Sequence, residues 1–424
     1  MSSGGVVVVG AGPAGCTLAL QLGRAGVPVT LVEARAGFAR QFRGDALMPS
    51  GLEALARMGL WDLFQCLPRR PLDGWSLRVE GRELFRVDEP LGSLQPCTLV
   101  RQQDLLEAVI AEGRRLPALQ WRSGVAVTGL LREGERVVGV RLADGEALPA
   151  ALVVAADGRD SPLRQQAGLT LLRPAAPIDV LWFRLPGHPQ LERRNDFLTL
   201  VGGGAIASAF GGADGQLQIG WVVAPGEPLP QLTAPAWCER FAALAPPWLA
   251  EHCHRSAAAL QGPLRLRVQV GLAPRWWQPG LLLLGDAAHP MSPVRAQGIN
   301  MALRDSLVAA EALIPLWRAP GGAGSAGPAP AWEPLDRTLA VIQARREPEI
   351  RRMQALQAAE ARQGQLIAHQ AQLRRLLAAA APLLGPLARA SWLRRQKPLR
   401  EGLAGSLPAS PVDVPVQLQT DRQA

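Results

Sequence analysis

Two side-chain types are almost missing from this chain. Its 424 residues include no tyrosine, and Lys397 is the only lysine, so all other basic residues are arginines. A mechanism that needs a tyrosine phenol, or a lysine ammonium group outside the C-terminal region, is therefore excluded.

Cysteines are few, and long apolar runs are absent. The five cysteines are scattered without a C-x-x-C pair, which is typical of a reducing compartment and not of a disulfide framework. The chain does not open on a basic segment followed by an apolar one, and no run of about 18 apolar residues follows. We expect a cytoplasmic protein without a signal peptide, a membrane span or a metal cluster.

The charge balance does not indicate a nucleic-acid-binding protein. The chain has 45 Lys+Arg and 36 Asp+Glu, a formal net charge of +9. The arginines lie between acidic residues along the whole chain and form no basic arm. With 48% hydrophobic and 19% charged residues, the chain is expected to fold into two or three globular units that bind small molecules.

The N-terminal segment predicts a dinucleotide-binding unit. An apolar run (6–9) precedes the turn G-A-G-P-A-G (10–15), a helical segment follows, and a second apolar run ends at Glu33. The first glycine permits the tight turn, the second lets a pyrophosphate approach the backbone, and the third allows close packing of helix on strand. The Glu33 carboxylate can accept hydrogen bonds from ribose hydroxyls and would repel a 2′-phosphate, which favours FAD or NAD over NADP.

Two further motifs place an aspartate directly after an apolar strand. The segment D-G-R-D-S-P-L-R (157–164) follows the run 151–156, and G-D-A-A-H-P (285–290) follows the run 281–284. Ligands of open α/β sheets bind at the carboxyl ends of the strands, where both aspartates would lie. Each alone is compatible with a simple turn or helix cap, but three such sites in one chain indicate a ligand site.

The three motifs, in this order, resemble the p-hydroxybenzoate hydroxylase family of FAD-dependent monooxygenases, which includes the ubiquinone-biosynthesis hydroxylases. The resemblance covers about residues 4–317. It implies an α/β fold in which a Rossmann-like FAD-binding domain is interleaved with an antiparallel β-sheet substrate domain and followed by C-terminal helices. The implied FAD-binding parts are 1–74, 101–176 and 266–317, the substrate parts 75–100 and 177–265, then a flexible linker (318–334), C-terminal helices (335–400) and a loosely ordered tail (401–424).

The resemblance also implies roles for individual residues. Those expected to contact FAD are Gly10, Gly12, Ala14, Gly15, Glu33, Arg35, Arg43, Arg101, Asp157, Asp286, Gly298 and Asn300. Pro293 would lie beside the reactive edge of the flavin, and His289 is either a proton-transfer group there or a packed core residue. The aromatic candidates for the substrate pocket are Trp182, Phe183, Phe210 and Trp221.

The implied reaction is hydroxylation of an aromatic or quinone-like small molecule by O₂. NADPH or NADH would reduce FAD, and oxygen would be transferred through a flavin C4a-hydroperoxide, which requires a dry site. A tyrosine relay that deprotonates a phenol cannot operate in a chain without tyrosine. Two alternatives stay open: an FAD-dependent reductase of an isoprenoid-type substrate, and a non-catalytic flavin-binding redox protein.

The C-terminal region has two interpretations. Arginine pairs at 345–346, 374–375 and 394–395, beside leucine pairs at 376–377 and 383–384, are compatible with a basic amphipathic surface that contacts a membrane peripherally. Alternatively, the helices form a solvated hairpin packed on the FAD domain, which the interrupting prolines favour.

Overall fold

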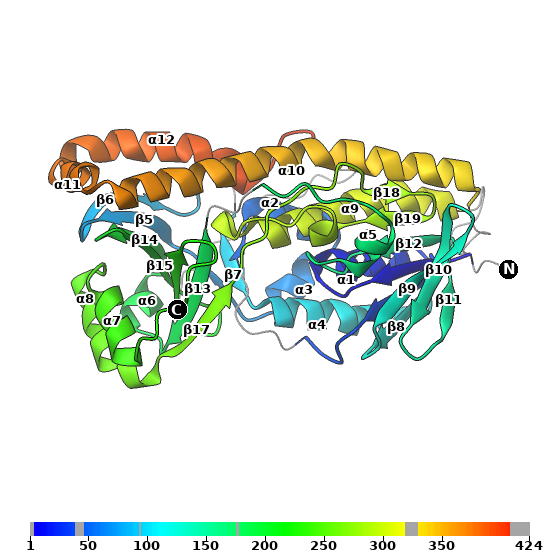
Figure 1. Cartoon of the computed structure of the whole chain (residues 1–424), viewed down its shortest axis with the longest axis horizontal. Helices are drawn as coiled ribbons and strands as arrows, with labels where there is room; N and C mark the ends of the chain where they lie inside the picture. The colour runs from blue at the N-terminus through cyan, green and yellow to red at the C-terminus, as the bar shows by residue number, and fades with distance from the viewer. Residues whose placement is uncertain (1–3, 39–45, 93–94, 175–177, 319–329, 408–424) are drawn as a thin grey trace.

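The computed structural model describes residues 4–38, 46–92, 95–174, 178–318 and 330–407. Two β-sheets lie along the long axis of the molecule, and the helix α10 (Trp332–His369) runs across both of them (Figure 1). The predicted combination of a parallel sheet, a second sheet and C-terminal helices is confirmed.

The first sheet is mainly parallel. Its strand order is β18-β19-β12-β1-β2-β8, with β1 (Val6–Val9), β2 (Val29–Glu33), β8 (Leu119–Ser123), β12 (Leu152–Ala155), β18 (Trp277–Gln278) and β19 (Leu281–Leu283). β1 pairs in parallel with β2 and β12, and β12 pairs in parallel with β19. The central strands read as continuous runs of Val, Leu and Ala because both faces of this sheet are covered.

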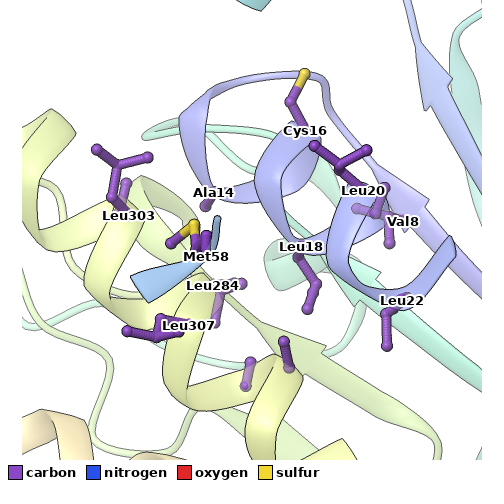
Figure 2. Close-up of a cluster of buried hydrophobic side chains, with 14 of the residues drawn as sticks. Val8, Ala14, Cys16, Leu18, Leu20, Leu22, Met58, Leu284, Leu303 and Leu307 are labelled. Carbon is purple, nitrogen blue, oxygen red and sulfur yellow. The ribbon is translucent and has the colours of Figure 1, made fainter. Parts of the chain in front are cut away.

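Helices cover one face of the first sheet. They are α1 (Pro13–Arg24), α4 (Gln102–Gly113) and α9 (Gln297–Trp317). Leu18 of α1 and Leu303 and Leu307 of α9 belong to one buried cluster (Figure 2). On the other face, Val7 and Val9 contact a cluster that includes the antiparallel ribbon β9 (Val127–Glu133), β10 (Arg136–Leu142) and β11 (Ala147–Pro149).

Smaller elements connect the two sheets. The short strands β3 (Ala46–Leu47), β4 (Arg69–Pro71) and β7 (Thr98–Val100) pair with one another. The short helices of this part are α2 (Pro49–Arg57) and α3 (Trp61–Gln65), whereas α5 (Pro162–Gln166) packs on β9, where Nε2 of Gln166 donates to the carbonyl oxygen of Thr128.

The second sheet brings together two distant parts of the chain. Its order is β17-β13-β16-β15-β14-β5-β6, with β5 (Gly74–Val79), β6 (Arg82–Asp88), β13 (Asp179–Leu185), β14 (Asp196–Gly202), β15 (Ala205–Gly211), β16 (Leu217–Val223) and β17 (Gln261–Leu266). It is antiparallel as predicted, except that β5 and β14 run parallel. The direction of that pair depends on how the chain returns from the first sheet, which strand patterns do not reveal.

Helices lie on opposite sides of the second sheet. In the sequence, α6 (Pro189–Arg193) lies between β13 and β14, and α7 (Ala234–Ala242) and α8 (Pro247–Arg255) lie between β16 and β17. α7 and α8 lie on the side away from the C-terminal helices (Figure 1). The C-terminal α11 (Ala371–Ala379) and α12 (Ala381–Glu401) lie near β5 and β6. The ring of Trp392 on α12 lies 6.1 Å from that of Trp75 and 5.7 Å from that of Phe85. The favoured packing of the C-terminal hairpin on the FAD domain holds at the end of α12, where Leu399 joins the buried cluster of the first sheet. It does not hold around Trp392, whose ring packs on aromatic rings of the second sheet.

Within the described residues, no single helix is long and apolar enough to cross a membrane. The pair α11 and α12 meets the length and composition criteria only when taken together, and it is bent by 104°.

Candidate flavin and substrate site

A cavity of about 1020 Å³ begins at the strand ends of the first sheet and continues to the second sheet. β19, β12, β1 and β2 are neighbours and parallel, so their carboxyl ends lie at the same edge. Gly12, Glu33, Asp157 and Asp286 follow or end these strands, and all four line the cavity. The structure thus brings the three sequence motifs to one place.

The three glycines of the first turn have different surroundings. Gly10 has φ +99°, and a Cβ atom there would lie 2.3 Å from the carbonyl oxygen of Ala156. A Cβ atom on Gly15 would lie 1.9 Å from the carbonyl oxygen of Gly10, whereas one on Gly12 would meet no described atom within 4 Å. Gly10 and Gly15 therefore permit the close packing of the turn, and Gly12 leaves room for a ligand at the first amides of α1, where anions bind. Gly15 does not line the cavity, while Gly10 and Ala14 do.

Glu33 is held at the cavity wall by the backbone. Its Oε2 accepts a hydrogen bond of 2.8 Å from the Ala11 amide, and its Oε1 accepts one of 3.1 Å from the Arg35 amide. Each carboxylate oxygen retains a further lone pair. This arrangement fits a carboxylate that accepts ribose hydroxyls, with Arg35 also lining the cavity.

Asp157 presents an unpaired oxygen beside the cavity. Its Oδ2 accepts from the Leu163 amide at 3.2 Å, but Oδ1 is buried without a hydrogen-bond partner among the described residues. Burial raises the pKa of this carboxyl above its ordinary value. Such an acceptor is suited to a hydroxyl group of a ligand.

The second motif also supports the third. The buried Arg164 donates from Nη1 to the carbonyl oxygen of Ala287 at 2.7 Å and from Nη2 to that of Arg159 at 3.1 Å. Because Ala287 follows Asp286 directly, Arg164 holds in place the loop that carries this aspartate.

Asp157→Asn is expected to stabilise the apoprotein at neutral pH. A raised pKa means that the wild type loses stability as the pH rises through that pKa, because ionisation of the buried carboxyl is unfavourable. Asparagine does not ionise, so the free energy of unfolding of the variant should exceed that of wild type by roughly 1 kcal/mol at pH 7. At a pH below the ordinary pKa of an aspartate carboxyl, the two proteins should be equally stable. Thermal melts from pH 4 to 8 test this, with the exposed turn variant Asp144→Asn as control; a pH-independent difference for Asp157→Asn would contradict it.

The third motif lies where the two parts of the cavity meet. Asp286, Pro293 and Gly298 line it, and Gly298 lies in the first turn of α9. Asn300 does not line the cavity, so a direct cofactor contact from its side chain is not supported. Its Nδ2 donates to the carbonyl oxygen of Ala296 at 2.7 Å, and its Oδ1 accepts from the Met48 amide at 2.9 Å. Asn300 thus ties the loop before α9 to the start of α2.

Two other predicted residues lie away from the cavity. Arg101 precedes α4 with its side chain 44% exposed and pairs with Asp104 at 3.8 Å, while the neighbouring Gln102 lines the cavity. His289 is 1% exposed, and its Nε2 lies 2.7 Å from Oδ2 of Asp305 on α9. Of the two alternatives for His289, the structure therefore supports the packed core residue and not the proton-transfer group, because its ring lies between Asp305 on α9 and the ring of Trp276, 4.8 Å away. Arg43 lies outside the described residues.

His289 belongs to a buried ion network between α9 and α10. Oδ1 of Asp305 accepts from Nε of Arg346 at 2.7 Å; Arg346 also pairs with Glu349, which lies 2.9 Å from Arg304. Burial opposes ionisation of Asp305, but the charges of His289 and Arg346 outweigh it and lower the pKa of that carboxyl. Burial likewise opposes ionisation of Glu349, yet the adjacent arginines lower its pKa to about 2.

The start of the C-terminal tail is anchored on this network. The Leu403 amide donates to Oε1 of Glu349 at 2.8 Å, and Oγ of Ser406 accepts from Arg304 at 2.6 Å. The expectation of a loosely ordered tail is therefore wrong for residues 402–407, while residues 408–424 lie outside the described residues. Residues 319–329 of the expected linker also lie outside them.

Aromatic rings line the part of the cavity beside the second sheet. Trp182 and Phe210 lie there with ring centroids 6.2 Å apart, and the ring of Phe197 stacks on that of Phe210 at 5.0 Å. The indole Nε1 of Trp182 is buried without a hydrogen-bond partner among the described residues. We call this part of the cavity, lined by Trp75, Trp182, Phe197, Phe210 and Trp392, the aromatic chamber.

Trp221 and Phe183 are not chamber residues. The ring of Phe183 lies 4.8 Å from that of Trp237, and the ring of Trp221 lies 5.8 Å from that of Phe241, both partners being on α7. Successive side chains of a strand point to opposite faces, so Gly220 and Val222 line the chamber while Trp221 points away. The pocket prediction is wrong for these two residues.

Sequence analysis missed three chamber residues. Phe197 could have been found, because it alternates with Thr199 and Val201 along β14, and all three line the cavity. Trp75 and Leu77 on β5 line the cavity, but so does Ser76 between them, so β5 carries no such alternation. Trp392 has no local signal, since only the docking of α12 brings it there.

Comparisons with known proteins agree with this site. The chain matches a family model described as an FAD binding domain over residues 4–325. It is 34% identical over 366 residues to the 6-methylpretetramide 4-monooxygenase of Streptomyces rimosus, covering 84% of this chain and 83% of that protein. It is 29% identical to the ubiquinone hydroxylase UbiL of Rhodospirillum rubrum, covering 73% and 72%.

Solved structures show the same fold. PqsL of P. aeruginosa in complex with 2-aminobenzoylacetate superposes with a TM-score of 0.73 at 21% identity, covering 88% of this chain and 98% of that one. The tetrameric form of 2-methyl-3-hydroxypyridine-5-carboxylic acid oxygenase superposes with a TM-score of 0.68 at 21% identity, covering 90% and 97%. With the glycine turn, Glu33 and the two strand-end aspartates at one cavity, the chain therefore belongs to the FAD-binding-domain family and is an FAD-dependent monooxygenase.

Proposed function

We propose that this protein hydroxylates a planar aromatic or quinone-like molecule large enough to fill the aromatic chamber, using O₂ and NADPH or NADH. The observation that carries the proposal is the continuity of the cavity. One end is formed by the loops that fit a dinucleotide, and the other by aromatic rings with few polar groups. The relatives named for 6-methylpretetramide and ubiquinone act on molecules of this kind.

The residues present fit FAD, which supplies the redox and oxygen chemistry when bound. In our proposal Gly12 and the α1 amides face the pyrophosphate, Glu33 the adenosine ribose and Asp286 the ribityl chain. The backbone amide of Gly298, in the first turn of α9, would face the flavin ring, where a helix N-terminus would stabilise negative charge on the reduced ring. Pro293, in the loop before this turn, also lines the cavity.

The chamber contributes dryness and orientation. Val180, Ile206 and Val222 from the sheet and Ile367 from α10 complete its walls, so a bound flat molecule would displace most of the water. The unpaired indole N–H of Trp182 is available to a carbonyl or hydroxyl oxygen of that molecule.

The absorbance spectrum of the purified protein, followed by anaerobic addition of NADPH and then NADH, tests the proposal. We expect an oxidised-flavin spectrum that bleaches with one of them, and faster oxygen consumption when a fused-ring phenol or hydroxyquinone is added, with one hydroxyl group gained by the product. Bleaching without any aromatic compound that couples it to oxygen incorporation would favour a reductase. A protein that cannot be reconstituted with FAD would overturn the proposal.

We further propose that α11 and α12 contact a membrane peripherally. Leu376, Leu383 and Leu387 are 59%, 80% and 70% exposed, and Arg375 and Arg389 beside them are also exposed. Exposed apolar side chains next to basic ones are typical of surfaces that lie on anionic lipid.

Replacing all three leucines by serine is expected to weaken binding to anionic vesicles by about tenfold or more, since each leucine would bury apolar area in the lipid. Vesicle cosedimentation measures this, with neutral phosphatidylcholine vesicles and the exposed-site variant Val341→Ser on α10 as controls. If wild type and triple variant sediment alike, the surface has another role.

A further inference from the structure

The loop between Pro293 and α9 contains an unusual backbone conformation. Among the described residues, the non-glycine residues with positive φ are Glu80, Arg295 and Ala296, and the last two are consecutive, with φ of 58° and 50°. The left-handed region is unfavourable for residues with a Cβ atom. Such outliers concentrate at functional sites, where the surrounding structure compensates for them. The side chain of Arg295 is held by neighbouring residues.

Arg295 reaches from this loop into the wall of the aromatic chamber. Its guanidinium carbon lies 4.7 Å from the ring centroid of Trp75, 5.4 Å from that of Trp392 and 5.9 Å from that of Phe197. The side chain is only 9% exposed and lines the cavity. A cation enclosed by three aromatic faces has lost most of its water, so a hydrogen bond from it to a further acceptor is stronger than in water, although Glu360 offsets part of its charge.

The guanidinium retains donors that other described residues do not use. Nη2 pairs with Glu360 of α10, whose other oxygen accepts from Nε2 of Gln396 on α12 at 2.9 Å. Nε is buried without a hydrogen-bond partner among the described residues. The ion pair with Glu360 therefore fixes the position of Arg295 but leaves it able to bind a further acceptor.

We propose that Arg295 selects and orients a substrate with an ionised phenol or enol oxygen, and holds that oxygen at the boundary between the flavin loop and the chamber. The inference rests on the proposed function and names the residue that decides its substrate class. A guanidinium forms its strongest hydrogen bonds with anionic oxygen. Electron donation from such an oxygen activates an aromatic ring toward oxygen transfer, which matters in a chain without tyrosine.

The test compares two ligands of nearly the same shape. 4-Nitro-1-naphthol is ionised at neutral pH, whereas 1-nitronaphthalene lacks the hydroxyl group. Their affinities for the oxidised holoenzyme are measured by calorimetry for wild type, Arg295→Met and Arg295→Lys. Arg394→Met serves as a matched control, because Arg394 lies on α12 beside the cavity-lining Arg395, is exposed and does not itself line the cavity.

We expect Arg295→Met to bind the naphtholate about tenfold or more weakly than wild type and to bind 1-nitronaphthalene equally well. Arg295→Lys should recover part of the difference, and Arg394→Met should change neither affinity. The absorbance band of the bound naphtholate should also shift in wild type but not in Arg295→Met. FAD content and circular dichroism establish that each variant is folded.

The outcomes separate this inference from the proposed function. If wild type binds both compounds, and Arg295→Met lowers both affinities equally or leaves both unchanged, Arg295 does not select for charge. The proposal that the aromatic chamber binds the substrate would then still hold. If wild type with bound FAD binds neither compound, the chamber is not an aromatic site and both proposals are overturned.

Discussion

The variant Gly12→Ala is expected to lose FAD affinity by about tenfold or more while its apoprotein melts at the wild-type temperature. A Cβ atom at Gly12 meets no described atom within 4 Å, so the apoprotein accommodates it. The backbone there has φ −75° and ψ −178°, which any residue adopts. The added methyl group would instead occupy the space where a pyrophosphate approaches the backbone. Quenching of FAD fluorescence on titration measures the affinity, and calorimetry measures the apoprotein.

Gly15→Ala provides the contrast within the same turn. Its Cβ atom would lie 1.9 Å from the carbonyl oxygen of Gly10, so the start of α1 must move away from β1. We expect this variant to lose roughly 3 kcal/mol of stability before any ligand is added. If Gly12→Ala binds FAD as tightly as wild type, the pyrophosphate does not lie over this turn and the assignment of the cofactor site fails.

Arg346→Met is expected to destabilise the protein by about 3–5 kcal/mol. The change removes the cation between Asp305 and Glu349, all of which are fully buried, and leaves two carboxylates near each other in the core. Chemical denaturation of the holoenzyme measures the loss. The control is Arg351→Met on the same helix, which removes an exposed i,i+4 pair with Glu347 and should cost about 0.5 kcal/mol or less.

The same network predicts the pH dependence of stability. Asp305 and Glu349 have pKa values below their ordinary ones. Their contribution to the free energy of unfolding is therefore present at pH values above the ordinary carboxyl pKa and is lost as the pH falls. For Glu349 the loss extends down to a pH of about 2. Without Arg346 the pKa values of both carboxyls rise, and the loss begins at higher pH. Equal effects of Arg346→Met and Arg351→Met, or an unchanged acid limb, would show that the network does not stabilise the packing of α10 on α9.

Local motifs were sufficient for the dinucleotide end of the site. Gly10, Gly12, Glu33, Asp157 and Asp286 each lie within a few residues of an apolar strand, so the sequence identified both the strand and the residue at its end. Because parallel strands share one edge for their carboxyl ends, these residues had to meet once the strands paired. The dinucleotide-binding end was therefore determined by the sequence alone, and the resemblance of the three motifs to a known family narrowed the ligand to FAD.

Only the tertiary structure decided the substrate end. An aromatic residue on a strand is recognisable in the sequence. The sequence does not show which face of the sheet α7 and α8 cover and which face lines the cavity, so it could not distinguish the role of Trp182 from that of Trp221. His289 and Asn300 stand in the right motif, yet their partners lie on α9 and α2. The docking of α10 and α12 brings Trp392 and Glu360 to the cavity and gives Arg295 its partners. The contact energies that decide this docking come from residues far apart in the chain.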